Sequence, residues 1–256
     1  MFRFIFLFFL SFSIFGQVKK SPKNTVKINL TGLGVSMLSL QHEYKIKRNF
    51  SVINTVFYRQ KVLMPFGTTI DKIAKKQGVG LTGIKFEYIF LDQAKIGYSG
   101  YSPEARWYVG KSKKVFLGAF GQIENFNAKV PAALPVRLRG MVAEVTTPVN
   151  FQFQTLSAGL LIGRKFQWKN LSADLIIVGP HPGFAKNFKV NLESEYFASL
   201  QEGDRAFLKE KLNERFGITE KYFSTVINEK GAFVNSIKPV PYLGIKGLIV
   251  NLGYSF

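Results

Sequence analysis

The sequence contains no cysteine, which excludes disulfide bonds and metal sites built on thiolates. It has only two histidines, His42 and His181, and this argues against a histidine-rich metal centre. No G-x-x-x-x-G-K-S/T phosphate-binding loop occurs, and the scattered glycines suit curvature or close packing within strands. We therefore expect no metal ion and no cofactor.

Acidic residues are few: 16 Asp and Glu stand against 35 Lys and Arg, which gives a formal net charge of +19. A strongly basic chain suggests nucleic acid or an anionic membrane surface as a partner. The basic residues are scattered among strand-like segments and form neither a dense tract nor a known nucleic-acid-binding motif. We therefore expect no nucleic-acid partner, and a membrane surface fits the dispersed charge better.

Long apolar runs are also missing after the first 17 residues, where no segment approaches the roughly 18 apolar residues of a membrane-spanning helix. Residues 1–16 differ, because Arg3 is followed by an apolar stretch through Phe15 and by the small Gly16. This layout is typical of a secretory signal peptide, so we expect export and one mature domain spanning 17–256. An exported chain without such a helix can cross lipid only as a closed barrel, since every backbone polar group must be satisfied there.

Apolar and polar residues alternate along several segments, which predicts strands with one apolar and one polar face. Along 242–256 the even positions are apolar and tipped by aromatics, while the odd positions are mostly small or polar. The other apolar faces are Leu38, Leu40, His42, Tyr44 and Ile46; Tyr101, Ala105, Trp107 and Val109; Leu156, Ala158, Leu160 and Ile162; and Leu171, Ala173, Leu175 and Ile177.

The connections between these segments fall into two classes. Tight basic joints lie at 46–49, 110–114 and 166–170, whereas longer segments cover about 59–96, 127–149 and 180–238, with one short link near Gly34. Short turns at one end and long loops at the other are typical of outer-membrane barrels. We predict an all-β fold, an eight-stranded antiparallel up-and-down transmembrane barrel; a strand-like piece at 80–92 leaves ten strands as an alternative.

The segment 180–238 contains the predicted helices. Ser199 and Glu202 have capping-box spacing, and the stripe that begins at Leu208 and continues through Leu212 and Phe216 ends at Gly217. A second short helix is predicted from Thr219 to about residue 231. We expect this helical loop to pack over the barrel mouth or on its own strands, with partner or membrane binding as the alternative.

Three stretches carry a resemblance to a known family. PEARWY (103–108) precedes a basic turn, VFLGAF (115–120) follows it, and the last stretch reads PYLGIKGLIVNLGYSF (241–256). Together with the export signal, they resemble small OmpA-like and OmpX-like outer-membrane β-barrels, in particular those of Gram-negative Bacteroidota. The resemblance spans about 20–256 and implies localisation in the outer membrane of a Gram-negative bacterium.

The resemblance also implies partners. In that family the last strand, ending in Phe, is what the outer-membrane insertion machinery recognises, which gives Leu252, Tyr254 and Phe256 the role of an insertion signal. The alternative is a buried terminal strand of a soluble periplasmic β protein. We expect a monomer in contact with outer-membrane lipid and lipopolysaccharide, with loop residues such as Arg137 and Arg139 facing phosphates or solvent.

Charged residues also occur on the faces expected to point into the lumen: Glu43, Lys45, Glu104, Arg106 and Asp174. An eight-stranded interior is just wide enough to be filled by side chains, and opposite charges can satisfy one another there. We therefore predict a structural charge network in the lumen, with an ion or proton pathway as the alternative.

The histidines give no sign of catalysis. Catalysis at the outer rim needs a His beside a Ser or an acid, so that a base can activate a hydroxyl or a water. His42 lies on the predicted lipid face and His181 in the predicted loop, so no catalytic residue is assigned. The predicted function is a non-enzymatic membrane protein, structural or presenting surface loops. A small-solute or ion pore and a lipid-modifying outer-membrane enzyme are the alternatives.

Overall fold

The computed structural model describes residues 22–79, 84–112, 114–138 and 141–256, so the predicted signal peptide lies outside it. Within these ranges eleven strands form one antiparallel sheet, and no helix is long and apolar enough to span a bilayer. The strands are β1 (Asn24–Asn29), β2 (Met37–Lys47), β3 (Phe50–Leu63), β4 (Lys95–Val109), β5 (Val115–Leu138), β6 (Met141–Trp168), β7 (Leu171–Glu193), β8 (Phe223–Asn228), β9 (Gly231–Ser236), β10 (Val240–Lys246) and β11 (Ile249–Ser255). The helices are α2 (Leu30–Gly34), α3 (Gly67–Gln77) and α4 (Glu202–Phe216), with 3-10 turns η1 (Phe86–Tyr88), η2 (Leu91–Gln93) and η3 (Glu195–Ser199).

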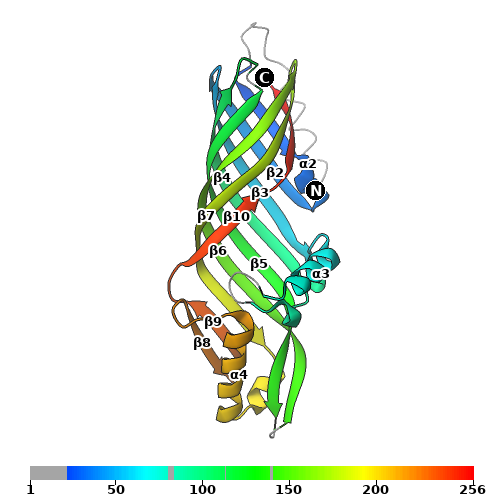
Figure 1. Cartoon of the computed structure of the whole chain (residues 1–256), viewed down its shortest axis with the longest axis vertical. Helices are drawn as coiled ribbons and strands as arrows, with labels where there is room; N and C mark the ends of the chain where they lie inside the picture. Colours follow the sequence, from blue (N-terminus) through cyan, green and yellow to red (C-terminus); the bar gives the residue numbers. More distant parts are fainter. Residues whose placement is uncertain (1–21, 80–83, 113, 139–140) are drawn as a thin grey trace, which may run out of the picture.

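Eight of these strands close into a ring, seen in the upper half of Figure 1. Strands β1 to β7 pair in chain order, and β11 closes the ring by pairing with both β7 and β1. Closure removes the unpaired edges that an open sheet would present. The all-β fold and the ring of eight agree with the sequence prediction. The strand predicted at 80–92 is wrong where the structure describes it, because residues 86–93 form the turns η1 and η2.

The two ends of the ring differ as predicted. Tight turns join β2 to β3, β4 to β5 and β6 to β7, and the last residue, Phe256, exchanges backbone hydrogen bonds with Asn24 at the same end. At the other end β5 and β6, of 24 and 28 residues, run far beyond the ring. The expectation of loops at 127–149 and through much of 180–238 is therefore wrong, since strand pairing continues there.

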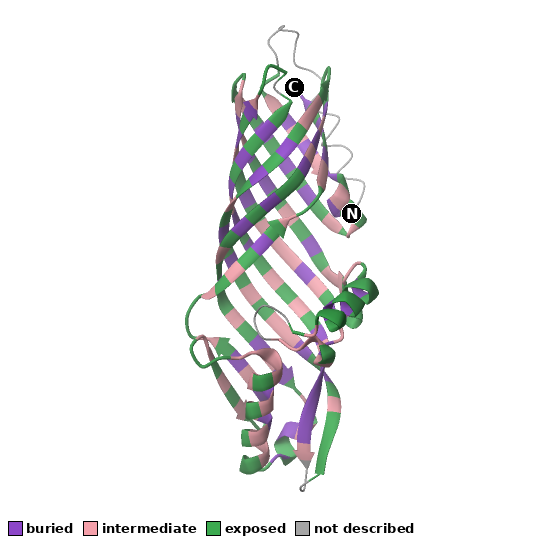
Figure 2. Ribbon diagram, in the orientation of Figure 1, coloured by how far each residue is buried: buried purple, intermediate pink, exposed green. Residues whose placement is uncertain are grey.

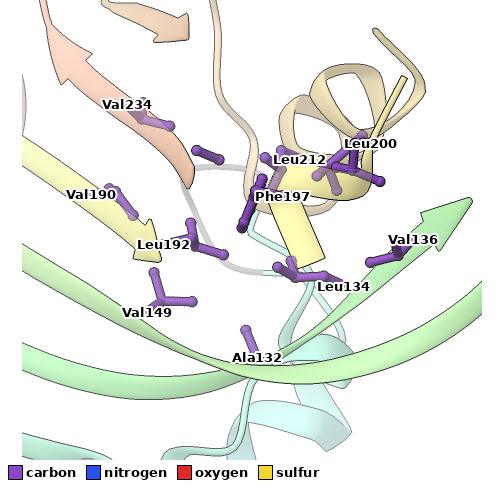
Figure 3. Packing of buried hydrophobic residues seen from close by; sticks show 12 residues of the cluster. Ala132, Leu134, Val136, Val149, Val190, Leu192, Phe197, Leu200, Leu212 and Val234 are labelled. Carbon is purple, nitrogen blue, oxygen red and sulfur yellow. The ribbon is translucent and has the colours of Figure 1, made fainter. Parts of the chain in front are cut away.

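A hydrophobic core packs against these strand extensions, and Figure 3 shows its side chains. We call this part the cap: the ends of β5, β6 and β7 together with η3, α4, β8 and β9. Its apolar residues are buried against one another and not against the ring interior. The buried members are Ala132, Leu134, Val136, Val149, Val190, Leu192, Phe197, Leu200, Leu208, Leu212, Ala232 and Val234.

The predicted helix in the cap is confirmed as α4, which buries Leu208 and Leu212 and ends at Gly217 in the left-handed conformation (φ 63°). The capping box is wrong, because Gln201 is the N-cap and the Ser199 hydroxyl donates to the Tyr196 carbonyl. The second helix is also wrong: β8 and β9 form a hairpin there. The β-branched run in β8 favours a strand once a partner strand lies beside it.

The segment 242–256 forms two strands, not one. β10 and β11 pair end to end along β7 and are separated at 247–248, beside an irregularity in the pairing of β7 with β6. The side-chain alternation changes phase there, so Tyr242 and Lys246 turn inward, whereas Leu252 and Tyr254 point outward. The predicted even-numbered apolar face is therefore correct for β11 and wrong for β10.

Elsewhere the predicted alternation is confirmed. Figure 2 shows buried and exposed residues alternating along the strands of the ring. In β2, for example, Ser39, Gln41 and Glu43 are buried while Leu40 and Tyr44 are exposed. The ring therefore has a largely polar interior, with one buried apolar cluster (Tyr108, Phe116, Phe120, Leu161 and Ile176), and an apolar exterior. This is close to the reverse of a soluble β-sandwich.

Candidate functional site

The interior of the ring near the tight turns holds a cluster of buried charges. Arg106 on β4 is fully buried; its Nε donates to Glu104 and its Nη1 donates to Asp174 on β7. Lys27 on β1 pairs with the same Asp174 and lies 2.6 Å from the Glu43 carboxylate on β2. Strand pairing thus brings together groups that are up to 147 positions apart in the sequence.

Two further side chains complete this cluster around Glu43. Lys165 Nζ on β6 lies 2.8 Å from one carboxylate oxygen, and the Tyr108 hydroxyl donates to the other at 2.6 Å. Three carboxylates therefore face three cations, and the formal charges balance. We call this set the lumen charge network: Lys27, Glu43, Glu104, Arg106, Lys165 and Asp174.

Four of the five charged residues predicted for the lumen belong to this network. The fifth, Lys45, lies half-buried on the inward face of β2 and forms no ion pair with another described residue. Lys27 and Lys165 were missed. The signal for Lys27 was present, because Thr25, Lys27 and Asn29 alternate with apolar residues along β1.

Ion pairs cross the ring at this level, although Arg106 Nη2 and Asp174 Oδ1 are buried without a hydrogen-bond partner among the described residues. The Arg106 guanidinium also lies 4.2 Å over the Phe116 ring, so aromatic contact takes one of its faces. Buried ion pairs of this kind are costly to break singly, because a lone charge is left in a poorly hydrated interior. The geometry thus fits a rigid plug better than a row of separate ion-binding positions.

A second inward group lies nearer the cap, and it corrects the prediction for His181. This residue is not in a loop but buried on β7, because the change of phase turns it inward. Its Nδ1 lies 3.0 Å from Ser157 Oγ on β6, and its ring packs edge-on against Phe120. Gly244 on β10 leaves the space that the ring occupies, since a Cβ there would lie 2.1 Å from the imidazole.

The Ser157–His181 contact has the spacing of a serine nucleophile and its base. Both side chains are buried, and neither lines the inner cavity of about 160 Å³, whose lining includes Glu104 of the lumen charge network. His42, in contrast, points outward as predicted and lies 3.1 Å from the Asn24 side chain. Among the described residues, no group of three His, Asp or Glu is placed to hold a metal ion.

The exterior of the ring carries a continuous apolar surface that includes the predicted insertion residues. Leu252, Tyr254 and Phe256 all point outward and are about half exposed. Trp107 and Trp168 lie on the same exterior beside the tight turns. Soluble monomers rarely expose large contiguous apolar surfaces, so this exterior calls for an apolar partner or solvent.

The ring thus combines a charge-balanced lumen charge network inside with an apolar surface outside. Both arise from strand alternation and ring closure and do not depend on any single motif. Comparison of the chain with protein-family models, curated proteins and solved structures gives no match.

Proposed function

We propose that this chain is an integral outer-membrane β-barrel of a Gram-negative bacterium, without enzymatic activity, which presents the cap at the cell surface. The observation that carries the proposal is the inverted ring, with polar and charged side chains inside and apolar side chains outside. In water such a ring would expose most of its large apolar residues. In lipid the same surface is solvated, and closure through β11 pairs the strand edges that an open sheet would leave free.

The size of the apolar exterior supports this placement. Outward positions of β5 from Val115 to Ile123 carry no charge, and those of β6 from Leu156 to Ile162 are likewise apolar. At about 3.4 Å per residue and a tilt of about 40°, the β5 stretch rises roughly 20 to 25 Å, close to the apolar band of known barrels. We call this surface the apolar band.

Polar side chains within the apolar band are paired. The Tyr101 hydroxyl donates to Asn54 across β3 and β4, and His42 contacts Asn24 across β1 and β2. Aromatic residues border the band near the tight turns, where Trp107, Trp168 and Tyr254 would lie at the headgroup level.

The filled interior favours a structural role over a pore. The lumen charge network crosses the ring from β1 to β4 and β7, so it closes the interior near the tight turns. In this orientation the tight turns face the periplasm and the cap faces outward. The outward-pointing Leu252, Tyr254 and Phe256 then serve as the insertion signal, and the chain acts as a monomer in lipid and lipopolysaccharide.

Single-channel conductance of the folded protein in a planar bilayer tests the proposal. Heat-modifiable gel migration of the same sample establishes that the ring has folded. We expect folded protein in the bilayer and no steady conductance. Steady, voltage-tolerant conductance would instead establish the pore alternative and make the network a pore lining.

An outer-membrane hydrolase is the second candidate, and only the Ser157–His181 contact favours it. A fluorophosphonate probe, which labels activated serines, tests it directly. Because both residues are buried, we expect no labelling of the wild-type protein above the level of Ser157→Ala. Labelling that Ser157→Ala abolishes would favour the enzyme.

A further inference from the structure

The outer surface of the ring changes from apolar to polar just beyond the apolar band, on the side of the cap. Outward positions of β5 and β6 switch from Ile123 and Leu156 to amides, while lysines occupy neighbouring positions on β3 and β7. These side chains border a groove of about 680 Å³, which we call the amide–lysine groove. Its polar members include Lys61, Ser99, Asn127, Gln152, Gln154 and Lys189.

Three lysines on adjacent strands lie at this end of the ring: Lys61, which lines the groove, and Lys95 and Lys129, which lie beside it. Lys95 on β4 lies directly opposite Lys129 on β5, an arrangement of like charges that destabilises a strand pair. Lys61 reaches across β4 to donate to the Asn127 side chain at 2.8 Å. Among the described residues, no Asp or Glu forms an ion pair with any of these three.

The crowding of these cations has an electrostatic consequence. Burial and repulsion from Lys129 lower the pKa of Lys61, which lies beyond the apolar band. An anion bound between the two ammonium groups would reverse the repulsion and favour the charged form of both. The position therefore suits a phosphate better than a second cation or a neutral group.

An apolar hollow lies on the same strands, inside the apolar band. It has a volume of about 820 Å³ and is lined by residues of β3 to β7, which are small or apolar except for Glu104. Ala105, Ala119, Ala158 and Pro182 are among them. On β5 and β6 the polar groove and the apolar hollow follow one another along each strand, so together they match a ligand that is polar at one end and apolar at the other.

We propose that this composite surface binds a phosphorylated glycolipid of the outer leaflet. The lysines contact its phosphate, the amides of Asn127, Gln152 and Gln154 hydrogen-bond its sugar hydroxyls, and an acyl chain lies in the apolar hollow. The inference rests on the proposed outer-membrane location, because that location brings the groove to headgroup level. A free phosphate would leave the hollow unused.

Binding to detergent-solubilised protein tests this inference, with diphosphoryl lipid A, its dephosphorylated form and inorganic phosphate as probes in native mass spectrometry. The variant is Lys61→Gln/Lys95→Gln/Lys129→Gln. Its matched control is Lys47→Gln/Lys111→Gln/Lys114→Gln, which removes the same charge at the tight-turn end. We expect diphosphoryl lipid A to bind the wild type and the groove variant to lose roughly a hundredfold in affinity, with the control unchanged. Ala158→Phe, which fills the hollow, should weaken lipid binding without affecting heat-modifiable migration.

The outcomes separate the inference from the proposed function. Equal losses in both triple variants, or full competition by inorganic phosphate, would overturn the lipid site and leave the membrane location standing. Failure of the wild-type protein to insert into phosphatidylcholine vesicles would instead overturn the proposed function, because that step needs no phosphorylated lipid. Insertion together with selective loss in the groove variant supports both.

Discussion

At the scale of single residues, Asp174 is the group on which the interior most depends, because it pairs with both Lys27 and Arg106. The variant Asp174→Asn would leave three buried cations facing two carboxylates. We expect a loss of about 3–5 kcal/mol in the free energy of unfolding, the usual cost of leaving a buried charge unpaired. Urea titration of protein in lipid vesicles, followed by tryptophan fluorescence, would measure it.

Two further variants control this measurement. Asp92→Asn makes the same chemical change at an exposed position in η2 and should change stability by less than about 0.5 kcal/mol. Lys27→Met/Asp174→Asn restores the balance of charge, so it should recover much of the stability lost in Asp174→Asn. A double variant as unstable as the sum of its single changes would show that charge balance is not what stabilises the interior.

Gly244 gives a second prediction at this scale. A Cβ at this position would lie 2.1 Å from the His181 ring, so Gly244→Ala must displace the imidazole. We expect Gly244→Ala to lower stability by about 1–3 kcal/mol through overpacking. In a His181→Ala background, Gly244→Ala should lower the free energy of unfolding only slightly. Urea titrations of the four proteins measure the difference between the two losses. Equal costs in both backgrounds would mean that the glycine is needed for another reason.

The direction of a side chain could be predicted from the sequence only where inward and outward positions alternate along the strand without interruption. Glu43, Glu104, Arg106 and Asp174 lie in uninterrupted period-2 stretches, so their inward direction followed from the pattern. His181 could not be placed, because its direction depends on an irregularity between β6 and β7 that only strand pairing determines. The groove lysines were missed for a related reason, since their proximity depends on register.

At the scale of elements, the cap has its own core and should respond separately from the ring. Leu208 of α4 is fully buried there, and Leu208→Ala should destabilise the cap by about 2–5 kcal/mol. We expect faster cleavage by trypsin within 194–238, while heat-modifiable migration of the ring stays unchanged. Glu210→Ala on the same helix, away from the buried stripe, is the control. Loss of ring folding in Leu208→Ala would show that the two cores form one cooperative unit.

The stability of the contact between α4 and the β3–β4 connection should also depend on pH. Hydrogen bonds from Lys211 and Lys85 lower the pKa of Glu214 to about 2, against about 4.3 in an unfolded chain. Because the pKa is lower in the folded state, the stabilisation is fully present above about pH 4.3 and is lost as the pH falls toward 2. Lys85 belongs to the β3–β4 connection, so this contact joins two separate elements of the cap end.

Pepsin provides the measurement, since it is active across this range. The ratio of cleavage rates for Glu214→Gln and wild-type protein, mapped to α4 by mass spectrometry, removes the pH dependence of the protease itself. We expect a ratio above one near pH 4.5 that approaches one near pH 2. A ratio that stays constant over the range would exclude Glu214 as the titrating group.

The helix predicted at 219–231 shows why the local sequence pattern was not enough to assign this segment. Tyr222, Phe223, Val226 and Ile227 suit one face of a helix by spacing, yet Val226 and Ile227 are β-branched. β9 lies beside them, pairs with β7 and supplies strand hydrogen bonds. Pairing with β9 therefore makes this segment a strand. The α4 segment pairs with no described strand, so its helical pattern predicted its structure correctly.

At the scale of the whole molecule, polarity is arranged along the long axis as well as from inside to outside. The apolar band lies on the ring and the amide–lysine groove lies beyond it. The cap, at the end of the molecule opposite the tight turns (Figure 1), carries a buried core. Each part suits a different surrounding medium: hydrocarbon, headgroups and water. In the proposed membrane location, this order of surfaces sets the depth of the molecule, and that depth can be measured.

Tryptophan offers a direct measure of depth, because the chain contains only two, and Trp107 and Trp168 both point outward beside the tight turns, 59% and 58% exposed. In vesicles of brominated phosphatidylcholine, their fluorescence should be quenched, and bromines near the headgroup should quench more than bromines near the bilayer centre, since tryptophan prefers the interface. Trp107→Phe and Trp168→Phe would each report the remaining residue, and both should give the same shallow profile because both lie at one end of the apolar band. Stronger quenching by central bromines for one of them would mean that the ring is tilted or placed at a different depth. If neither is quenched in protein that migrates as folded, the apolar exterior must be covered by something other than lipid, and the outer-membrane proposal fails.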